Sequence, residues 1–460
     1  GAKTYIGSTF ISNGVLRISH GTGLGTTAGN TTVLPNSALE LTGGISSAEP
    51  LVLLGVGVSG AGAIRNISGN NTNSGTISLS GNGTVGVDSS SDALTLSGVI
   101  SASSATNNFS KTGVGVLHLT ANNSFGSQLV ISGGVVSVSS INSSASANQP
   151  LGARSSSPSV RLGSTAFSGS DRGTLRYAGG SSATTPKTIR LTESSQGGIN
   201  VVTNGVDLEI SGVISIGDTS AALYKTGAGR LILSGVNTYD GQTRVEAGVL
   251  RVTNADGLGD SANSANQDTY VSSGAAVEIS GGITVAERFN LNGTGISSGG
   301  ALRNLSGSNV VSGRIFLDGA ARINSDADWL NIINATAMTS AFGLTFGGSG
   351  NVTISTPINT GANTLTKDGS GTLVISGVNT YSGATTISAG TVIITGTAGS
   401  SAFTVSSGGT LRGNNTVGAL TVNGLIAPGL NTNDPGTFVS SSTALGAGGK
   451  MVFDIGNVAG

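Results

Sequence analysis

Apolar and polar residues alternate along most of this chain in runs of four to six residues. In the run from 372 to 376, Leu373 and Ile375 point to one face of a strand, and the residues beside them point to the other. Corners rich in glycine and asparagine bound these runs, as at residues 376–379. The pattern predicts many short β-strands joined by tight turns.

The chain also repeats itself. Residues 225–251 and 367–393 align without a gap over 27 positions, of which 14 are identical. A third copy starts at Lys111 and has Phe125 where the other two copies have tyrosine. Similarity of this kind along a whole chain indicates a repeat protein.

Strands this short cannot bury much apolar surface alone, so each copy must stack on its neighbours. A chain that coils, so that strands of successive coils pair in parallel, meets this requirement. We therefore predict an all-β fold, a parallel β-solenoid that forms a single elongated rod. With roughly 20 to 25 residues per coil and about 4.8 Å between paired strands, the rod is on the order of 100 Å long. A series of β-sandwiches is the alternative, but no proline-rich or charged linker separates the repeats.

The repeats divide the chain into modules of unequal length, which we attribute to insertions in loops. The predicted parts are the end of a truncated repeat at residues 1–20, solenoid modules at 21–139, 140–253 and 254–396, and a C-terminal solenoid segment at 397–460. Because residues 4–16 align with 380–392, the sequence begins halfway through a repeat, and we expect it to be a piece of a longer protein.

Composition narrows the class of protein. Charged residues make up 9% of the 460 residues, the net charge is −1 and 76 residues are glycine. A near-neutral chain has no electrostatic footprint for nucleic acid, and no apolar run approaches the roughly 20 residues that span a bilayer as a helix. The absence of cysteine excludes disulfides and thiolate metal sites. We predict no nucleic-acid partner and no membrane insertion of this segment.

Motifs that carry chemistry are sparse. The pattern Gly-x-Gly-x-x-Gly occurs twice, which is about the number that chance gives in so glycine-rich a chain, and neither copy opens a helix. His118 lies between two leucines and is expected to face solvent, and His20 lies in a polar corner, so neither fits a hydrolase triad. The acidic residues are dispersed, with Asp326 and Asp328 among the closest pairs, which we interpret as solvated surface charges. We predict no catalytic residue, no cofactor and no metal site.

Trp329, the single tryptophan, is a candidate contact residue for a glycan or a partner surface. Aligned segments hold Ala93 and Asp207 in the same slot, so we place this position at the edge of a coil rather than in the core. The alternative is that the indole covers the apolar insertion at residues 332–346.

One arginine recurs in three modules. Residues 62–69 and 300–307 are near-copies that place Arg65 and Arg303 at the same position, and Arg176 follows in a looser third copy. We expect these arginines to donate hydrogen bonds to corner carbonyls between coils, and ligand binding is the alternative.

The 27-residue repeat has a Gly-x-Gly-x-Leu opening, an Asn-Thr-Tyr-x-Gly core and an Ala-Gly close. In the two best copies the opening and core residues are Gly227, Gly229, Leu231, Asn237, Thr238, Tyr239 and Gly241, and Gly369, Gly371, Leu373, Asn379, Thr380, Tyr381 and Gly383. The unit resembles the passenger-associated repeat of bacterial autotransporters, and residues 405–453 resemble the segment that follows such repeats in that family. We assign these residues a structural role.

The resemblance implies a right-handed parallel β-helix, exported to the extracellular or outer-membrane-attached surface of a Gram-negative-type bacterium. Members of the family serve as adhesins, spacers or self-associating surface proteins. We predict a non-enzymatic structural segment that acts as a rigid rod in self-association or adhesion. Its expected partners are copies of itself, end to end or lateral, and cell-surface or matrix glycans. The alternatives are a carbohydrate-active β-helix enzyme and a pure spacer.

Overall fold

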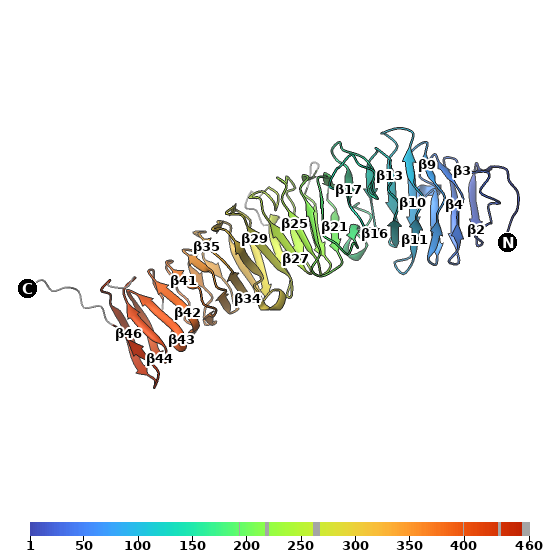
Figure 1. Cartoon of the computed structure of the whole chain (residues 1–460). Helices are drawn as coiled ribbons and strands as arrows, with labels where there is room; N and C mark the ends of the chain where they lie inside the picture. The colour runs from blue at the N-terminus through green and yellow to red at the C-terminus, as the bar shows by residue number, and fades with distance from the viewer. Residues whose placement is uncertain (193, 217–219, 261–266, 399, 431–433, 453–460) are drawn as a thin grey trace, which may run out of the picture. The chain divides into compact units, whose positions relative to one another are not determined.

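The computed structural model describes residues 1–192, 194–216, 220–260, 267–398, 400–430 and 434–452. The chain divides into two compact units, Gly1–Gln242 and Thr243–Gly460. Each unit is a stack of coils whose short strands pair in parallel with strands of the coils before and after (Figure 1). The prediction of a parallel β-solenoid is therefore confirmed in both units. Among the described residues no helix has the length and apolarity needed to cross a bilayer.

Unit 1 contains three long ladders of parallel strands and a shorter one. The first ladder is β1 (Thr9–Ile11), β3 (Thr31–Val33), β6 (Leu51–Leu53), β9 (Ile77–Leu79) and β12 (Ile100–Ala102). The second is β2 (Gly14–Ile18), β4 (Ser37–Thr42), β7 (Ile64–Ser68), β10 (Gly83–Val87), β13 (Phe109–Thr112), β15 (Leu129–Ile131), β17 (Val160–Leu162), β20 (Ile189–Leu191) and β23 (Ile214–Ile216). The third is β5 (Ser46–Ser47), β8 (Asn71–Asn73), β11 (Ala93–Leu96), β14 (Val116–Leu119), β16 (Val135–Val138), β18 (Gly173–Tyr177), β21 (Gln196–Val201) and β24 (Ala222–Thr226). The short ladder is β19 (Ala183–Thr185), β22 (Asp207–Ile210) and β25 (Arg230–Leu233), and the unit also holds the 3-10 helices η1 (Val58–Gly60) and η2 (Gly169–Asp171).

Unit 2 is built in the same way, but three long strands turn a corner and belong to two ladders each. Its first ladder is β26 (Thr243–Val245), β28 (Thr269–Val271), β31 (Phe289–Gly293) and β34 (Ile315–Ser325). The second is β27 (Val249–Val252), β29 (Ala276–Ser280), β32 (Leu302–Ser306), β34, β37 (Leu344–Gly347), β40 (Leu365–Lys367), β42 (Thr385–Ile394), β43 (Phe403–Gly413), β44 (Asn415–Val422) and β46 (Phe438–Leu445). The third is β30 (Thr284–Val285), β33 (Asn309–Val311), β35 (Trp329–Ile332), β38 (Asn351–Ile354), β41 (Thr372–Ile375), β42, β43, β45 (Leu425–Pro428) and β47 (Lys450–Met451). β36 (Met338–Thr339) pairs with β39 (Ile358–Asn359), and η4 spans Ile296–Ser298.

The core of each unit lies inside the coils, where apolar side chains of successive strands stack in columns. Pairing is in register, so the predicted period of two puts the same face of every strand inward. One such column, every member of which is buried, consists of Leu94, Leu117, Val136, Leu175 and Ile199. Burying an aliphatic side chain contributes about 1.5–3 kcal/mol, so the columns hold the coils together.

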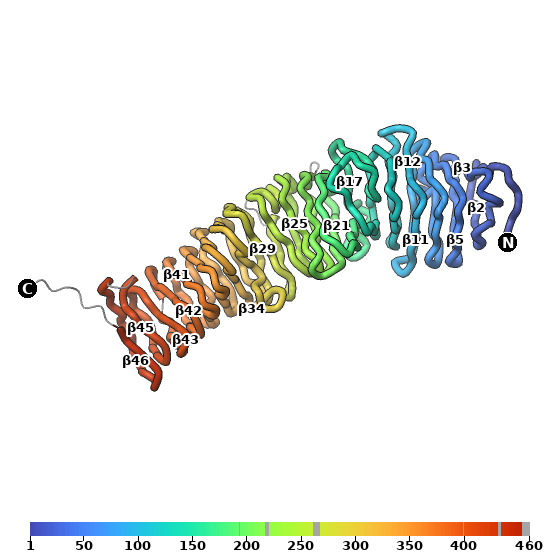
Figure 2. The backbone as a smooth tube through the Cα atoms, viewed as in Figure 1, coloured from blue at the N-terminus to red at the C-terminus, as the bar shows by residue number. Residues whose placement is uncertain are grey.

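Coil length varies more than the sequence predicted. Phe403 pairs with Thr385, 18 residues earlier, whereas Thr174 pairs with Val135, 39 residues earlier. The expected 20 to 25 residues per coil is therefore too narrow, because residues 139–172 form a long excursion between two paired strands. Within unit 1 this excursion interrupts an otherwise close succession of coils (Figure 2).

Candidate functional site

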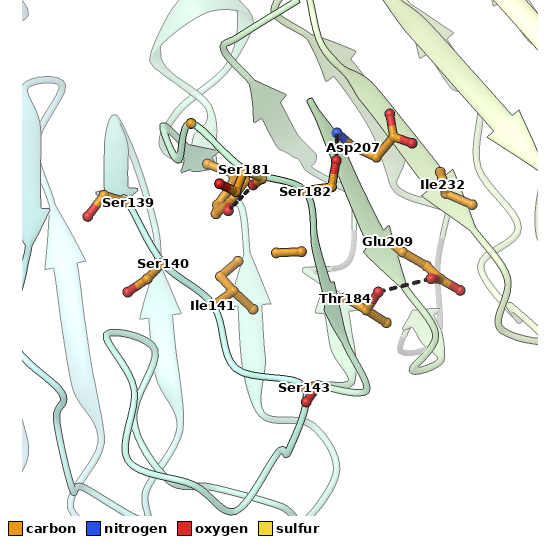
Figure 3. A pocket seen from close by; sticks show the side chains of 13 residues that line it. Ser139, Ser140, Ile141, Ser143, Ser181, Ser182, Thr184, Asp207, Glu209 and Ile232 are labelled. Carbon is orange, nitrogen blue, oxygen red and sulfur yellow. Dashed lines mark hydrogen bonds between the residues drawn. The ribbon is translucent and has the colours of Figure 1, made fainter. Parts of the chain in front are cut away.

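A groove of about 720 Å³ is hollowed into the side of unit 1 next to this excursion. One wall follows β16, a second is the segment that joins β18 to β19, and the floor lies on β22 and β25 (Figure 3). The residues that line it are Ser139, Ser140, Ile141, Ser143, Tyr177, Gly180, Ser181, Ser182, Ala183, Thr184, Asp207, Glu209 and Ile232. The lining is dominated by hydroxyl groups, with two carboxylates and little aromatic surface.

Local hydrogen bonds fix the second wall. Tyr177 is 3% exposed, and its hydroxyl donates to the Ser181 carbonyl at 2.6 Å. The hydroxyl of Ser182 accepts a hydrogen bond from the backbone N–H of Asp207 at 3.0 Å. The turn is thus tied to the core on one side and to the next coil on the other, which presents Ser181 and Ser182 at the mouth of the groove.

Both carboxylates in the groove have partners within the protein. Asp207 forms an ion pair with Arg230 at 2.8 Å. Glu209 accepts hydrogen bonds from the hydroxyls of Thr184 at 3.0 Å and Ser234 at 2.6 Å. A carboxylate held in this way can still accept a hydrogen bond from a ligand hydroxyl, because each oxygen has two lone pairs. The arrangement suits a polyhydroxylated ligand, and no group of three metal-ligating side chains occurs in the described part of the chain.

The lysine that opens each full repeat is buried. Lys111, Lys225 and Lys367 are at most 2% exposed, and each ammonium donates to the carbonyls of the next two residues at 2.6–2.8 Å. Lys111 also reaches the carbonyl of Gly133 in the following coil, at 3.2 Å. Burial lowers the pKa of Lys111 and Lys225 to about 7 and that of Lys367 to about 8. The lysine therefore fastens the corner of its own coil from inside.

The glycines of the repeat lie where another coil passes too close for a side chain. Gly227 and Gly369 have φ of +78° and +73°, and a Cβ on either would meet the carbonyl of Val201 or Gly348. The same backbone crowding from the preceding coil is found at Gly229, Gly241, Gly371 and Gly383. Leu231 and Leu373, which follow the openings, are fully buried.

The Asn-Thr-Tyr core of the repeat binds the preceding coil. The side-chain oxygens of Asn237 and Asn379 each accept from an isoleucine backbone N–H, of Ile214 and Ile358 respectively, at 2.8 Å. The following threonine returns its own backbone N–H to the carbonyl of the same isoleucine. These threonines are Thr238 and Thr380, with distances of 2.9 and 3.1 Å.

The tyrosine of the core is completely buried. Tyr239 and Tyr381 are 0% exposed, and the Tyr381 hydroxyl contacts that of Thr385 at 2.9 Å. In the first copy Phe125 takes this place and packs on Phe109, with ring centroids 5.6 Å apart. All the repeat residues singled out in the sequence thus lie at corners or in the core, away from the groove.

The charged residues form a ladder of alternating sign in each unit. In unit 1 Glu40 lies between Arg17, at 2.7 Å, and Arg65, at 3.2 Å, and Arg65 continues to Asp88 at 2.8 Å. In unit 2 the same order is Arg251, Glu278, Arg303 and Asp326, with distances of 2.7 and 3.2 Å for the first two contacts. The expectation that Arg65 and Arg303 bind corner carbonyls is therefore wrong, because carboxylates of the neighbouring coils hold both guanidinium groups.

The remaining sequence candidates lie apart from the groove. Trp329 begins β35, is 37% exposed and pairs in register with Asn351, which agrees with a coil edge, and its role as a contact residue remains a prediction. Asp326 ends the unit 2 ladder, and Asp328 accepts the backbone N–H of Gly307 at 2.8 Å. These two aspartates are structural partners and not free surface charges.

The ladders expose a duplication that sequence comparison missed at first. Residues 31–88 and 269–326 align without a gap at an offset of 238, with 26 identities in 58 positions. The buried pair Thr31 and Glu49, whose side chains bond at 2.8 Å, recurs as Thr269 and Glu287 at 2.9 Å. A gapless comparison at every offset is the signal that identifies it. The groove, in contrast, has no sequence signal, because serine and threonine are common everywhere in this chain.

Comparison with known proteins agrees with the fold and the repeats. Residues 1–18, 109–138, 223–252 and 365–394 match the passenger-associated-transport-repeat family. Over 340 residues, 72% of this chain, the sequence is 30% identical to the adhesin BmaC autotransporter of Brucella suis biovar 1 (strain 1330). This chain is an autotransporter passenger segment. It spans 8% of the length of that adhesin, and no solved structure matches it.

The match explains which positions of the passenger segment recur. Each of the last three matched ranges contains the lysine-capped corner and the buried aromatic residue of the Asn-Thr-Tyr core or its first-copy equivalent. The repeats and the adhesin relative place the segment outside the cell, at the outer-membrane-attached surface of a Gram-negative bacterium. The predicted module boundaries, in contrast, stay a prediction.

Proposed function

We propose that this passenger segment is the non-enzymatic supporting part of a surface adhesin. It contacts cell-surface or matrix glycans, and copies of itself, through side chains on the outside of its coils. The observation that carries the proposal is the pair of charge ladders. Because Glu40, Arg65 and Asp88, and their counterparts in unit 2, bind each other from coil to coil, they connect coils and are not free for catalysis.

The hydroxyl-lined groove of unit 1 is the contact site that the geometry favours for a neutral part of a glycan. Its serine and threonine hydroxyls and the free lone pairs of Asp207 and Glu209 match the donors and acceptors of sugar hydroxyls. The engagement of Asp207 by Arg230 and of Glu209 by two hydroxyls favours binding over hydrolysis. The adhesin relative, by its name, supports attachment rather than turnover.

Beads coated with the purified segment test the proposal on cultured epithelial cells. We expect adhesion above that of albumin-coated beads, and a decrease of at least threefold after glycans are removed from the cells enzymatically. Ser140→Trp fills the groove and should lower adhesion, whereas Ser91→Trp, at an exposed serine elsewhere in unit 1, should not. Adhesion that is equal for all three proteins rejects the groove, and no adhesion by any of them rejects the adhesive role.

The enzymatic alternative is tested on the same protein. We expect no new reducing ends when the segment is incubated with a panel of bacterial and host polysaccharides. Release of reducing ends that is lost in both Asp207→Asn and Glu209→Gln would make the groove an active site and overturn the non-enzymatic assignment.

A further inference from the structure

A second concavity of unit 1 lies on the outer face of the third ladder. His118 in β14 pairs in register with Ser137 in β16, Ser137 with Arg176 in β18, and Arg176 with Asn200 in β21. These four side chains form one outward row across successive coils. Together with Ala178, Val202 and Gly227 they line a cavity of about 370 Å³, within the range of small-ligand pockets.

Arg176 is the exception among the three recurring arginines. Arg65 and Arg303 each pair in register with a glutamate of the preceding coil, Glu40 and Glu278. Each also binds an aspartate two residues beyond its register partner in the following coil, Asp88 or Asp326.

At Arg176 both of these places have lost their acid. Ser137 stands where the glutamate would be, and Val202, two residues beyond Asn200, stands where the aspartate would be. In the part of the chain that the structure describes, Arg176 makes no hydrogen bond and no ion pair. Its guanidinium is half-buried, and burial lowers its pKa. A partly desolvated cation without a counter-ion is unfavourable, so the site favours an incoming anion.

The other groups in the cavity agree with an anionic ligand. The ionisable side chains that line it are His118 and Arg176, and the lining holds no acid. His118 was expected to face solvent, but it is half-buried there, and burial and then Arg176 lower its pKa. Asn200 donates through Nδ2 to the Thr226 hydroxyl at 2.8 Å and has an unpartnered buried Oδ1. Half a turn of the amide lets Thr226 donate to Oδ1 and puts the amide N–H groups where the unpartnered oxygen now lies.

We propose that this cavity binds the carboxylate or sulfate group of an acidic saccharide, with Arg176 forming the ion pair. A guanidinium presents two parallel N–H donors that match either oxyanion. A saccharide fits better than an acidic peptide because the adjoining groove begins at Ser139 and Tyr177, which follow Ser137 and Arg176 closely on the same strands, and is lined by hydroxyls. The proposal deepens the adhesive function and takes its biological meaning from it.

The two histidines make a direct measurement feasible. In the His20→Gln protein the only imidazole signal belongs to His118, and its chemical shift is followed by NMR while a chondroitin sulfate tetrasaccharide is added. We expect a saturating shift and a rise in the pKa of His118, because a bound anion favours the imidazolium. Maltotetraose, which is uncharged, should leave the signal unchanged. Sodium sulfate should shift the signal at least tenfold more weakly than the tetrasaccharide, since it lacks the sugar contacts.

Variants separate the ion pair from the fold. Arg176→Gln should weaken binding of the tetrasaccharide at least tenfold, whereas Arg65→Gln, the same position within the unit 1 ladder, should leave it unchanged. Ser137→Glu restores the acid that Glu40 and Glu278 supply elsewhere, and those glutamates are as buried as Ser137. We expect this variant to keep its circular dichroism spectrum and melting temperature while losing binding, because Arg176 is then neutralised from within.

Three results would overturn the proposal: a His118 signal that does not respond to the tetrasaccharide, sulfate binding as tight as tetrasaccharide binding, or tighter binding of a polyglutamate peptide. The outcome is independent of the bead experiment. A segment that binds the tetrasaccharide but does not hold beads to cells rejects the adhesive role and keeps this site, and the reverse result rejects this site alone.

Discussion

At the scale of single residues, the lysines show how this chain uses its few charges. Of the six lysines, four are at most 2% exposed: Lys111, Lys187, Lys225 and Lys367. Buried lysine is rare unless its ammonium is satisfied. Here the acceptors are backbone carbonyls at corners, groups that the parallel ladders cannot pair. The lysine of the repeat is therefore a corner clamp, and its chemistry is structural.

Removing one clamp should be costly. In Lys111→Met the volume of the side chain is kept, but three carbonyls lose their donor. A buried polar group without a partner costs about 1–3 kcal/mol, so we expect a loss of about 3 kcal/mol in the local free energy of opening. Hydrogen exchange of β13 and β15 measures it. The matched control is Lys3→Met, at an exposed lysine, and equal exchange in the two variants would show that Lys111 is dispensable.

The same lysines predict a pH dependence. Burial lowers the pKa of Lys111 and Lys225 to about 7 and of Lys187 and Lys367 to about 8, below the ordinary 10.5. The unfolded chain therefore binds more protons than the native one between these values, and stability rises with pH in this window. Glu287, whose pKa burial raises to about 8, acts in the opposite direction only below that pH. The melting temperature should therefore increase from pH 8 to 9.5, and the increase should be smaller in Lys111→Met/Lys225→Met. A wild-type melting temperature that falls over this interval contradicts the assignment.

At the scale of elements, the charge ladders tie strands of successive coils together. The glutamates at their centres are similarly buried, with side chains 4% exposed at Glu40 and 2% at Glu278. Their arginines differ, because Arg17 is 61% exposed and Arg251 only 19%. Solvent screens an exposed ion pair, so the two ladders should differ in strength although their residues are the same.

Substituting each central glutamate measures that difference. We expect Glu278→Gln to cost about 3 kcal/mol in the opening of β29 and β32, and Glu40→Gln about 1 kcal/mol in the opening of β4 and β7. Hydrogen exchange at low and at 0.5 M salt reports both values. The effect of Glu40→Gln should shrink at high salt more than that of Glu278→Gln, and equal costs at both salts would refute the role of exposure.

The corner glycines allow a comparison between conformation and crowding. Gly361 and Gly369 both have positive φ, +60° and +73°, but only at Gly369 would a Cβ collide with another coil, at the backbone of Gly348. Gly361→Ala should cost about 1 kcal/mol, the price of the left-handed conformation alone. Gly369→Ala should cost clearly more, and urea unfolding followed by circular dichroism compares the two. Equal midpoints would mean that the coils can separate at this corner without penalty.

Much of the element level could be predicted from sequence, because strand faces and corners are local. The alternation at Leu373 and Ile375 and the glycines that follow such runs are enough to infer stacked parallel strands. Partners across coils are not local, so the pairing of Arg65 with Glu40 and Asp88 could not be inferred from Arg65 itself. Nor could the ladder be assigned: β13 and β24 carry the same repeat positions, Lys111 and Lys225, yet lie in the second and the third ladder of unit 1.

The groove and the anion cavity were beyond prediction for the same reason. Their walls come from segments that are distant in sequence, such as Ser139 and Glu209, and a hollow exists only where a coil is longer or a side chain smaller than its neighbours. Arg176 illustrates the point. Its recurrence was visible in the sequence, but the loss of its counter-ions became visible only when Ser137 and Val202 were found at the places of the acids.

At the scale of the whole molecule, the segment offers few charges to keep copies apart. The net charge is −1, and many of the charged side chains are neutralised in ladders. Low charge permits association, but it does not supply an attractive surface. That surface comes from the Ser-Gly-Val corner of the repeat, where Val236 is 51% exposed and Val378 67%. The first copy of the repeat has Asn122 at this corner, so the chain itself shows that a polar residue is tolerated there.

We therefore expect the segment to self-associate through these corners, and Val236→Asn/Val378→Asn to weaken the association without a change in fold. Sedimentation velocity at increasing protein concentration measures it, with circular dichroism as the control for folding. The substitutions remove about 2 kcal/mol or less of apolar contact each, which corresponds to a weakening of roughly tenfold or more for the pair. Because the net charge is near zero, association should change little between 0.05 and 0.5 M salt. A wild-type segment that sediments as a single species at all concentrations would restrict the adhesive role to glycans, and association that is unaffected by the asparagines would move the contact to another part of the surface.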